Sequence, residues 1–183
     1  MYGTSYKVIN DRDIRWYKKN TSVLHREDGP AIEYNNGRKE WWINGKCHRE
    51  DGPAVECKNG DKLWYLYGKL HRNDGPAVEC KNGDKLWHVD GKLHRTDGPA
   101  IEYWQVGFLS TEYWYLNGKR HREGGPAVHF YNDDKFWYLN GEQHREDGPA
   151  EEWANGDKVW YLNGKRFSSE EEFCREMIRI NNK

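Results

Sequence analysis

The sequence predicts an all-β protein, an elongated array of antiparallel β-hairpins forming a single-sheet solenoid, with a short C-terminal capping α-helix. The motif His-Arg-x-x-Gly-Pro-Ala occurs six times, and its successive histidines are 23, 23, 23, 27 and 23 residues apart. Such self-similarity identifies a repeat architecture. Ten Trp and twelve Tyr at recurring positions, with a mean hydropathy of −1.18, favour a thin structure built on large rings rather than a thick aliphatic core.

Each repeat is expected to contain two turns. In residues 52–75, the β-rich runs 54–57 and 62–66 flank Asn59-Gly60, which predicts a two-residue type I′ turn with Val55 opposite Trp64 and Cys57 opposite Lys62. Equivalent first turns are Asn36-Gly37, Asn82-Gly83 and Asn155-Gly156. A second turn follows in every copy, at Asn44-Gly45, Tyr67-Gly68, Asp90-Gly91, Asn117-Gly118, Asn140-Gly141 and Asn163-Gly164.

This pairing divides each repeat into two faces. Val55, Trp64 and Leu66 are expected on an apolar face, and Ala54, Glu56, Leu63 and Tyr65 on the opposite one. Other members expected on the apolar face are Ile32, Tyr34, Trp41, Ile43, Val78, Cys80, Trp87, Val89, Val128, Phe130, Trp137 and Leu139. The opposite face is expected to carry a more polar aromatic ladder, formed by Trp42, Tyr65, Tyr115, Tyr138 and Tyr161.

Three segments are expected along the chain. Residues 1–24 resemble a degenerate capping repeat, because Trp16-Tyr17 matches the Trp-Tyr position without a Gly-Pro-Ala segment. Residues 25–166 carry the hairpin repeats. Residues 167–183 should form an amphipathic helix: Ser168 and Ser169 each have a Glu three residues on, and Phe173, Met177 and Ile180 follow at helical spacing. An open stack needs its end covered, so a structural cap is expected, with a partner-binding helix as the alternative.

The repeated His, Arg and Asp residues can be interpreted as catalytic or as structural. An active site needs one asymmetric constellation, and no copy adds a nucleophile or cofactor motif that the others lack, so we expect no enzyme. The expected structural residues are His25, Arg26, His48, Arg49, His71, Arg72, His94, Arg95, His121, Arg122, His144 and Arg145. Each His and Arg is expected to hydrogen-bond the connection between hairpins and to pair with the following Asp, a position that holds Gly124 in the fifth copy. His129, at a Glu-like position, is interpreted as variation on a solvated face.

No metal or other cofactor is expected. Histidines stacked about 10 Å apart cannot share one zinc ion. Residues 104–111 hold the four extra residues of the long interval and add Trp104 and Phe108. Insertions in repeat proteins often mark the binding face, so these two residues are candidate partner contacts. A tolerated loop extension is the alternative.

The charge balance and the cysteines limit the class of protein. With 29 basic and 30 acidic residues, the chain has no net field that favours nucleic acid. It has no apolar run of membrane-spanning length, and its N-terminus lacks the apolar core of a secretory signal. Cys57 and Cys80, one repeat apart, should lie beyond disulfide reach, and Cys47 and Cys174 have no evident partner. Reduced thiols in the cytoplasm are therefore expected.

The unit Trp-Tyr-Leu-Asn-Gly-Lys-x-His-Arg-x-Asp-Gly, clearest at 114–125 and 137–148, resembles MORN-type repeats and related Asn-Gly-Lys hairpin repeats over roughly residues 5–166. The Arg after the His and the added Pro-Ala depart from the MORN pattern. The His-Arg-Asp-Gly-Pro-Ala variety is similar to uncharacterised bacteriophage and giant-virus proteins. This resemblance implies a hairpin scaffold for protein contacts or self-association, and for a viral chain a host factor as target.

Two functions are therefore considered. The first is a non-catalytic scaffold that binds a partner protein through Trp42, Tyr65, Tyr115, Tyr138, Tyr161, Trp104 and Phe108. The second is a small-ligand or nucleotide binder that sequesters or hydrolyses its ligand through the repeated His, Arg and Asp side chains. Homodimerisation stays open, because strand edges and apolar rings are expected to be exposed.

Overall fold

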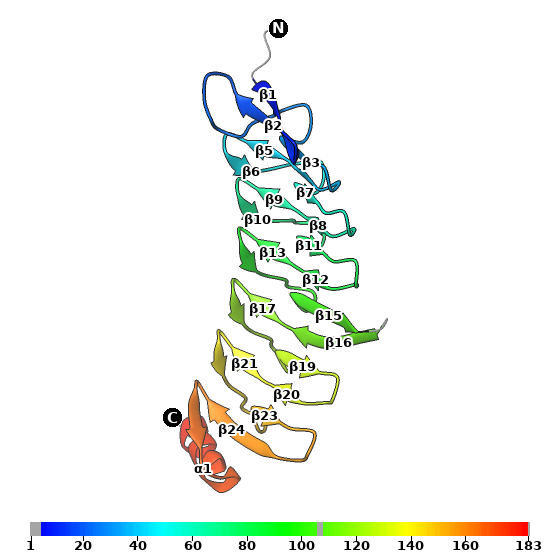
Figure 1. The fold of residues 1–183 in the computed structure, drawn as a ribbon. Coiled ribbons are helices and arrows are strands. Elements are labelled where there is room, and N and C mark those ends of the chain that lie inside the picture. Colours follow the sequence, from blue (N-terminus) through cyan, green and yellow to red (C-terminus); the bar gives the residue numbers. More distant parts are fainter. Residues whose placement is uncertain (1–4, 106–107, 183) are drawn as a thin grey trace. The chain divides into compact units, whose positions relative to one another are not determined.

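A computed structural model describes residues 5–105 and 108–182. The side chains of residues 108 and 109 are not described. The chain divides into two units, unit 1 at residues 1–92 and unit 2 at residues 93–183. Both are antiparallel hairpin arrays, and unit 2 ends in one helix, which confirms the predicted fold class (Figure 1).

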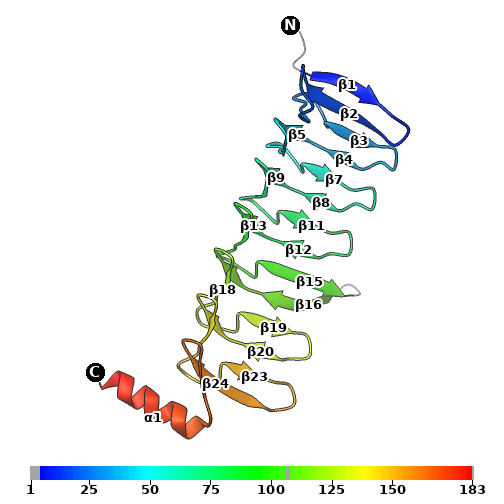
Figure 2. The same ribbon diagram turned by 60° about the vertical axis from the view of Figure 1, so that its left-hand side comes forward.

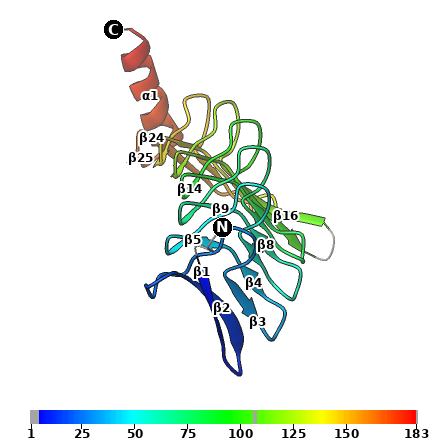
Figure 3. The same cartoon turned by 90° about the horizontal axis from the view of Figure 1, so that it is seen from above.

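The main sheet of unit 1 runs in the order of the chain, with one short hairpin after another. Its strands are β1 (Ser5–Ile9), β2 (Asp13–Lys18), β3 (Ile32–Tyr34), β4 (Lys39–Glu40), β7 (Val55–Glu56), β8 (Lys62–Leu63), β11 (Val78–Glu79) and β12 (Lys85–Leu86). Small two-stranded hairpins follow alternate main-sheet strands. They consist of β5 (Trp42–Ile43) with β6 (Lys46–Cys47), β9 (Tyr65–Leu66) with β10 (Lys69–Leu70), and β13 (His88–Val89) with β14 (Lys92–Leu93). In unit 1 the small hairpins lie to one side of the main-sheet strands (Figures 2 and 3).

Unit 2 repeats this arrangement with longer strands at the insertion. Its main-sheet strands are β15 (Ile101–Gln105), β16 (Phe108–Tyr113), β19 (Val128–Phe130), β20 (Lys135–Phe136), β23 (Glu151–Glu152), β24 (Lys158–Leu162) and β25 (Lys165–Phe167). Its small hairpins are β17 (Tyr115–Leu116) with β18 (Lys119–Arg120), and β21 (Tyr138–Leu139) with β22 (Glu142–Gln143).

The first turns at Asn36-Gly37, Asn59-Gly60, Asn82-Gly83 and Asn155-Gly156 differ from the prediction. At Asn59-Gly60 the loop has three residues: the Cys57 N–H donates to the Asp61 carbonyl, and only Gly60 has positive φ. The reason is local. The Asn59 side-chain oxygen accepts the Asp61 N–H at 3.2 Å, while its amide donates to the Asp61 carboxylate at 2.7 Å. This Asx contact and a glycine in the left-handed region are typical of three-residue hairpin loops.

The extra loop residue shifts the register by one, so the predicted pairs Val55–Trp64 and Cys57–Lys62 are wrong. Val55 lies opposite Leu63, and Glu56 opposite Lys62. Because side chains alternate along a strand, Val55, Cys57, Leu63, Tyr65 and their equivalents form one face, called here the Val face. Glu56, Lys62, Trp64 and their equivalents form the other, the Trp face. Trp64 and its equivalents therefore do not share a face with the valines, whereas the Tyr65 ladder does.

The second turn matches the prediction. Asn44 and Gly45 both have positive φ, 49° and 74°, as a type I′ turn requires. The same pair of angles recurs at every second turn, including Tyr67-Gly68 and Asp90-Gly91. The Gly45 N–H donates to the carbonyl of Leu24 in the preceding repeat at 2.8 Å. This turn therefore ties each repeat to the one before it.

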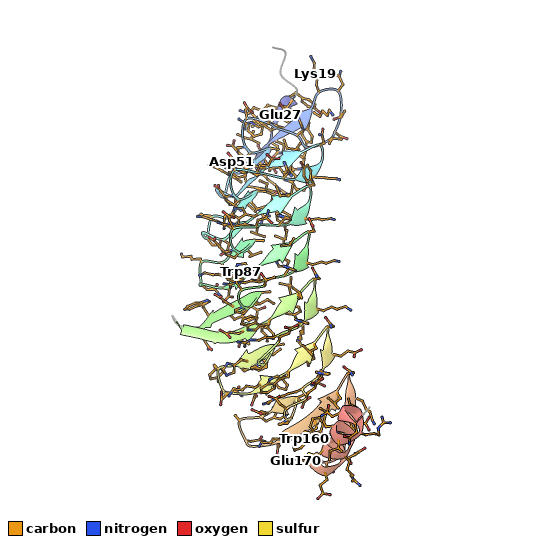
Figure 4. The ribbon with its side chains drawn as sticks, turned by 180° about the vertical axis from the view of Figure 1, so that it is seen from behind. Lys19, Glu27, Asp51, Trp87, Trp160 and Glu170 are labelled. Atoms are coloured by element: carbon orange, nitrogen blue, oxygen red, sulfur yellow. The ribbon has the colours of Figure 1, made fainter. Side chains whose placement is uncertain are left out.

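Ser169 is the N-cap of helix α1 (Glu170–Asn181), and its hydroxyl accepts the Glu172 N–H at 3.2 Å. The Glu172 carboxylate accepts from the backbone N–H and the hydroxyl of Ser168. Phe173 packs edge-to-face on Phe167 with ring centroids 5.7 Å apart, in a cluster with Leu162, Trp160 and Met177. Figure 4 shows Trp160 and Glu170 at this end of unit 2. Ile180 remains 48% exposed, so the predicted apolar stripe is buried only in its first turns.

Candidate functional site

The motif arginine is held in a sandwich. The Arg49 guanidinium carbon lies 4.1 Å from the centre of the Trp41 ring, a cation–π distance. On its other side, a Cβ added to Gly52 would lie 3.0 Å from that carbon, so this glycine leaves the space that the guanidinium needs. The same stack occurs for Arg26 on Trp16, Arg72 on Trp64, Arg122 on Trp114 and Arg145 on Trp137, at 3.9–4.1 Å.

In most repeats the motif arginine also donates hydrogen bonds to two carboxylates and one backbone carbonyl. Arg49 donates from Nε to Asp51 at 2.9 Å, and from Nη1 to both the Pro53 carbonyl and Glu56 at 3.2 Å. The predicted pairing of Arg with the following Asp is therefore present, and the Glu on the neighbouring strand is a further partner, whereas the motif His binds the turn of the next repeat. Hydrogen bonding to arginine lowers the pKa of Asp28, Asp51, Asp74, Asp97 and Asp147.

The motif histidines connect neighbouring repeats. His48 Nδ1 accepts the backbone N–H of Tyr67, the first residue of the next repeat's second turn, at 3.1 Å. All six histidines accept the equivalent N–H at 3.1–3.2 Å. A nitrogen that accepts carries no proton, so this bond favours the tautomer with the proton on Nε2. His25, His48 and His144 point that Nε2 at a Glu two residues on, 3.3–3.6 Å away.

Each motif alanine lies directly before a main-sheet strand, as Ala54 does before β7. Each of the six is fully buried. The Trp41 N–H donates to the Ala54 carbonyl at 2.8 Å, and the Ala31 N–H donates to the Glu40 carbonyl at 2.8 Å. A larger side chain at these positions has no free volume to occupy. His, Arg, Gly and Ala of the motif therefore all make contacts that build the stack.

The predicted ladder residues lie on the Val face and are half-buried. Tyr65 packs against the cluster of Cys47, Ala54 and Val55, and burial raises its pKa. The Trp42 indole N–H donates to Glu40 at 2.9 Å. Tyr115 and Tyr138 are brought together by Arg120, which donates to their hydroxyls at 3.3 and 3.4 Å. Tyr161 pairs with Arg166 in the last hairpin.

The insertion lengthens the hairpin of β15 and β16. The strand register shifts between Tyr103 and Trp104, where Tyr103 pairs with Thr111 and Trp104 with Leu109. Trp104 is half-buried at this irregularity. The backbone of Phe108 pairs with Gln105, but its side chain, the second partner contact predicted here, lies outside the described part of the chain.

A row of aromatic rings on the Val face of unit 2 was not predicted. Neighbouring rings meet edge-to-face with centroids 4.9–5.9 Å apart, across β15, β16, β19, β20 and the residue after β23. This aromatic row consists of Tyr103, Tyr113, Phe130, Phe136 and Trp153. Its end members Tyr103 and Trp153 are 39% and 41% exposed. The sequence indicates this row through the 23-residue spacings of Tyr113 to Phe136 and of Phe130 to Trp153. The wrongly predicted strand register placed these residues on different faces.

A cation lies beside the aromatic row. The Arg120 guanidinium carbon is 5.8 Å from the ring centre of Tyr113 and 5.2 Å from that of Tyr138. Arg120 is half-buried among tyrosines. Aromatic rings with an embedded arginine are the composition that protein interfaces favour at their energetic centres.

The remaining candidate chemistry is sparse. In the described residues the four cysteines form no disulfide, and burial raises the pKa of Cys47 to about 12, which opposes thiolate formation. Across residues 5–105 and 108–182, no three His, Cys, Asp or Glu side chains gather as a metal site. The helix that the structure describes is too short and too polar to span a bilayer.

No family model matches this chain, and no curated protein matches it.

Proposed function

We propose that the protein is a non-catalytic scaffold that binds a partner protein through the aromatic row of unit 2. The observation that carries this proposal is the continuous contact of Tyr103, Tyr113, Phe130, Phe136 and Trp153, with both ends exposed. Large rings contribute much contact area at little cost in conformational entropy, and their edges and faces pair well with rings of a partner.

The motif side chains favour a scaffold over a ligand-binding or hydrolytic site. Each His Nδ1 already accepts a backbone N–H. Asp28, Asp51, Asp74, Asp97 and Asp147 each accept from an arginine. An imidazole that acts as a general base needs a free nitrogen lone pair, and the motif histidines use theirs within the stack. The pKa of each of these aspartates is lowered by its arginine, which makes the carboxylate a weak base. The repeated polar residues thus support the array on which variable side chains are displayed.

The resemblance to phage and giant-virus repeats extends the proposal: in a viral chain the partner is a host protein. We place the interaction in the cytoplasm, where four unpaired cysteines remain reduced. The MORN-like hairpin repeat is retained as the proposed family relationship.

The test compares wild-type and variant bait in affinity capture from host lysate, followed by quantitative mass spectrometry. Phe136→Leu with Trp153→Ala shortens the aromatic row, and Leu63→Ala is the matched change at the position of unit 1 equivalent to Phe136. We expect one stoichiometric protein with wild type and with Leu63→Ala, and at least a tenfold loss with the row variant, as for hot-spot truncation. Equal capture by all three folded baits would exclude the row.

A second bait, Trp104→Ala with Phe108→Ala, tests whether the insertion contributes. Loss of the same protein from this bait extends the binding surface to the hairpin of β15 and β16. Unchanged capture restricts it to the aromatic row. Circular dichroism and a thermal melt of each bait confirm that a loss is not caused by unfolding.

A further inference from the structure

One motif arginine lacks the carboxylate partners that the others have. In five repeats the arginine Nε donates to the Asp two residues on at 2.7–3.0 Å. In the same five, Nη1 donates to the Glu seven residues on at 2.7–3.2 Å. In the fifth repeat these two positions hold Gly124 and His129. Two independent changes thus remove both anions from the same cation.

Arg122 keeps the rest of the arginine site. Its guanidinium carbon lies 3.9 Å from the Trp114 ring centre, and Nη1 donates to the Pro126 carbonyl at 3.1 Å. His129 does not replace the missing Glu, because its Nε2 contacts Asp133 at 3.0 Å, and Asp133 is also paired with Lys135 at 2.7 Å. Within residues 5–105 and 108–182, no carboxylate forms an ion pair with Arg122.

The motif loop is open at Gly124, which stands where the other repeats have Asp. Gly124 has a φ of 73°, unlike those Asp residues, and a Cβ built on it meets no atom within 4 Å. Arg122 and Gly124 line a hollow between two successive motif loops, with Trp137 and Leu139 as its apolar part. Other polar lining residues are Glu123, His144, Arg145, Glu146 and Asp147. Asp147 accepts from Arg145 at 2.7 Å, and Glu146 lies 3.5 Å from His144, so these two carboxylates already have partners.

Unit 1 contains the matched hollow with the carboxylate in place. It is lined by Arg26, Asp28, Trp41 and Ile43, which are equivalent to Arg122, Gly124, Trp137 and Leu139. There Asp28 binds the Nε of Arg26 at 2.8 Å and Glu33 binds its Nη1 at 3.2 Å. The two hollows differ in whether the chain itself supplies the anion. This comparison indicates what an external ligand of Arg122 must resemble.

We propose that Arg122 binds a carboxylate supplied by an Asp or Glu side chain of another protein, with an apolar neighbour of that residue against Trp137 and Leu139. The guanidinium, already oriented by Trp114 and Pro126, offers Nε in the direction that receives a carboxylate oxygen in the other repeats. A preoriented planar fork binds carboxylates with directional, charge-assisted hydrogen bonds. The site lies on the Trp face, whereas the aromatic row lies on the Val face, so the inference goes beyond the proposed function.

The first experiment needs no partner protein. The Arg Nε–H resonances of the full ¹⁵N-labelled chain are followed by NMR while N-acetyl-glutamyl-leucinamide is added, and N-acetyl-glutaminyl-leucinamide serves as the uncharged control. We expect a saturable shift of the Arg122 resonance with the glutamyl peptide, smaller shifts of Arg26 and Arg145, and at least tenfold weaker binding of the glutaminyl peptide. Equal shifts of all six motif arginines, or none, would overturn the proposal.

Gly124→Asp with His129→Glu supplies the matched variant, because Asp and Glu occupy these two positions in the other five repeats and bind Nε and Nη1 of the arginine. We expect its Arg122 Nε–H resonance to move toward those of Arg26 and Arg145 before any peptide is added, and affinity for the glutamyl peptide to fall at least tenfold. The reciprocal variant, Asp28→Gly with Glu33→His, should give Arg26 a new peptide-dependent shift. If the variant Gly124→Asp with His129→Glu binds the peptide as wild type does, Arg122 is not the binding group.

Inorganic phosphate is the competing anion. Phosphate is added to wild type and to the variant Gly124→Asp with His129→Glu at the same ionic strength. Phosphate that binds more weakly than the glutamyl peptide supports a carboxylate site whose apolar part contributes. Phosphate that binds more tightly at Arg122 contradicts the proposed ligand class.

Discussion

Units 1 and 2 share the residues that stack the repeats and differ in the residues that the Val face displays. In both units the motif alanines are fully buried and the motif arginines lie on tryptophan rings. Along the hairpins, however, unit 1 has Cys57, Leu63 and Cys80 where unit 2 has aromatic rings. The motif side chains are therefore constant between the two units, and the side chains that the hairpins carry on the Val face differ.

The largest expected effect tests the shared part. Ala54→Leu in unit 1 and Ala127→Leu in unit 2 each add a branched side chain where the alanine is fully buried. Overpacking of this kind costs about 1–3 kcal/mol, and we expect similar losses in both units. Urea unfolding followed by tryptophan fluorescence measures them. A tolerated leucine in one unit only would show that the two stacks are not built alike.

A smaller effect is expected at the second turns. Unit 1 places Tyr67 at a φ of 50°, where unit 2 has Asn117, Asn140 and Asn163. The left-handed region costs most L-residues about 1–2 kcal/mol and asparagine less. Tyr67 also stacks on His48 with ring centroids 4.4 Å apart, but it is 65% exposed.

We therefore expect Tyr67→Asn to raise the free energy of unfolding by less than about 1 kcal/mol, because relief of strain outweighs the loss of an exposed stack. Tyr67→Ala is the control, since it removes the ring and keeps the strain, and it should destabilise. Denaturant midpoints of the three chains decide the order. A destabilised Tyr67→Asn would mean that the ring stack outweighs the strain.

A pH-dependent effect is expected at His88, which occupies the position of Tyr115, Tyr138 and Tyr161 in unit 2. Burial lowers the pKa of His88, and its Nδ1 has no hydrogen-bond partner among the described residues. The unfolded chain then binds the proton more readily, so folding stability falls as pH drops below about 6.5. His88→Tyr should reduce this loss, seen as a smaller decrease in Tm between pH 7 and 5.5. If Tm falls equally with pH in wild type and His88→Tyr, His88 is not the source of the pH dependence.

The smallest effect concerns the exposed Asp residues of the arginine sites. Hydrogen bonds from arginine lower the pKa of Asp51, so its contribution is present above the unfolded value near 3.9 and disappears as pH falls through the folded value. Asp51→Asn should therefore lower Tm slightly at pH 7 and leave it unchanged at pH 2. Gly124, where no carboxylate exists, provides the internal reference: Gly124→Ala should show no such pH dependence.

Features that depend on neighbouring residues in the chain were predicted from the sequence. The six motifs, the second turns and the Ser169 N-cap each follow from a local signal. The first turn was wrong because the Asn59 side chain binds Asp61, a competition that the Asn-Gly pair alone does not reveal.

The one-residue error in the predicted register placed Trp64 and its equivalents on the wrong face. The arginine stacks and the aromatic row could therefore not be inferred. The site at Arg122 could be predicted only in part from the sequence, because Gly124 and His129 both depart from the residues of the other repeats. Their connection appears only when the Asp and Glu of the other repeats are seen to bind one guanidinium.

The bonds between repeats also define what can change in such a chain over evolutionary time. His48 reaches 19 residues ahead to Tyr67, and the Cys47 carbonyl accepts from Gly68. Each of these bonds ends in the adjacent repeat. If residues 54–76 are removed, Pro53 is joined to Ala77, and the turn at Asp90-Gly91 takes the place of the turn at Tyr67-Gly68 as the partner of His48. Unequal recombination can therefore add or remove whole repeats without creating a new fold. The number of repeats between two binding surfaces then changes in steps of one.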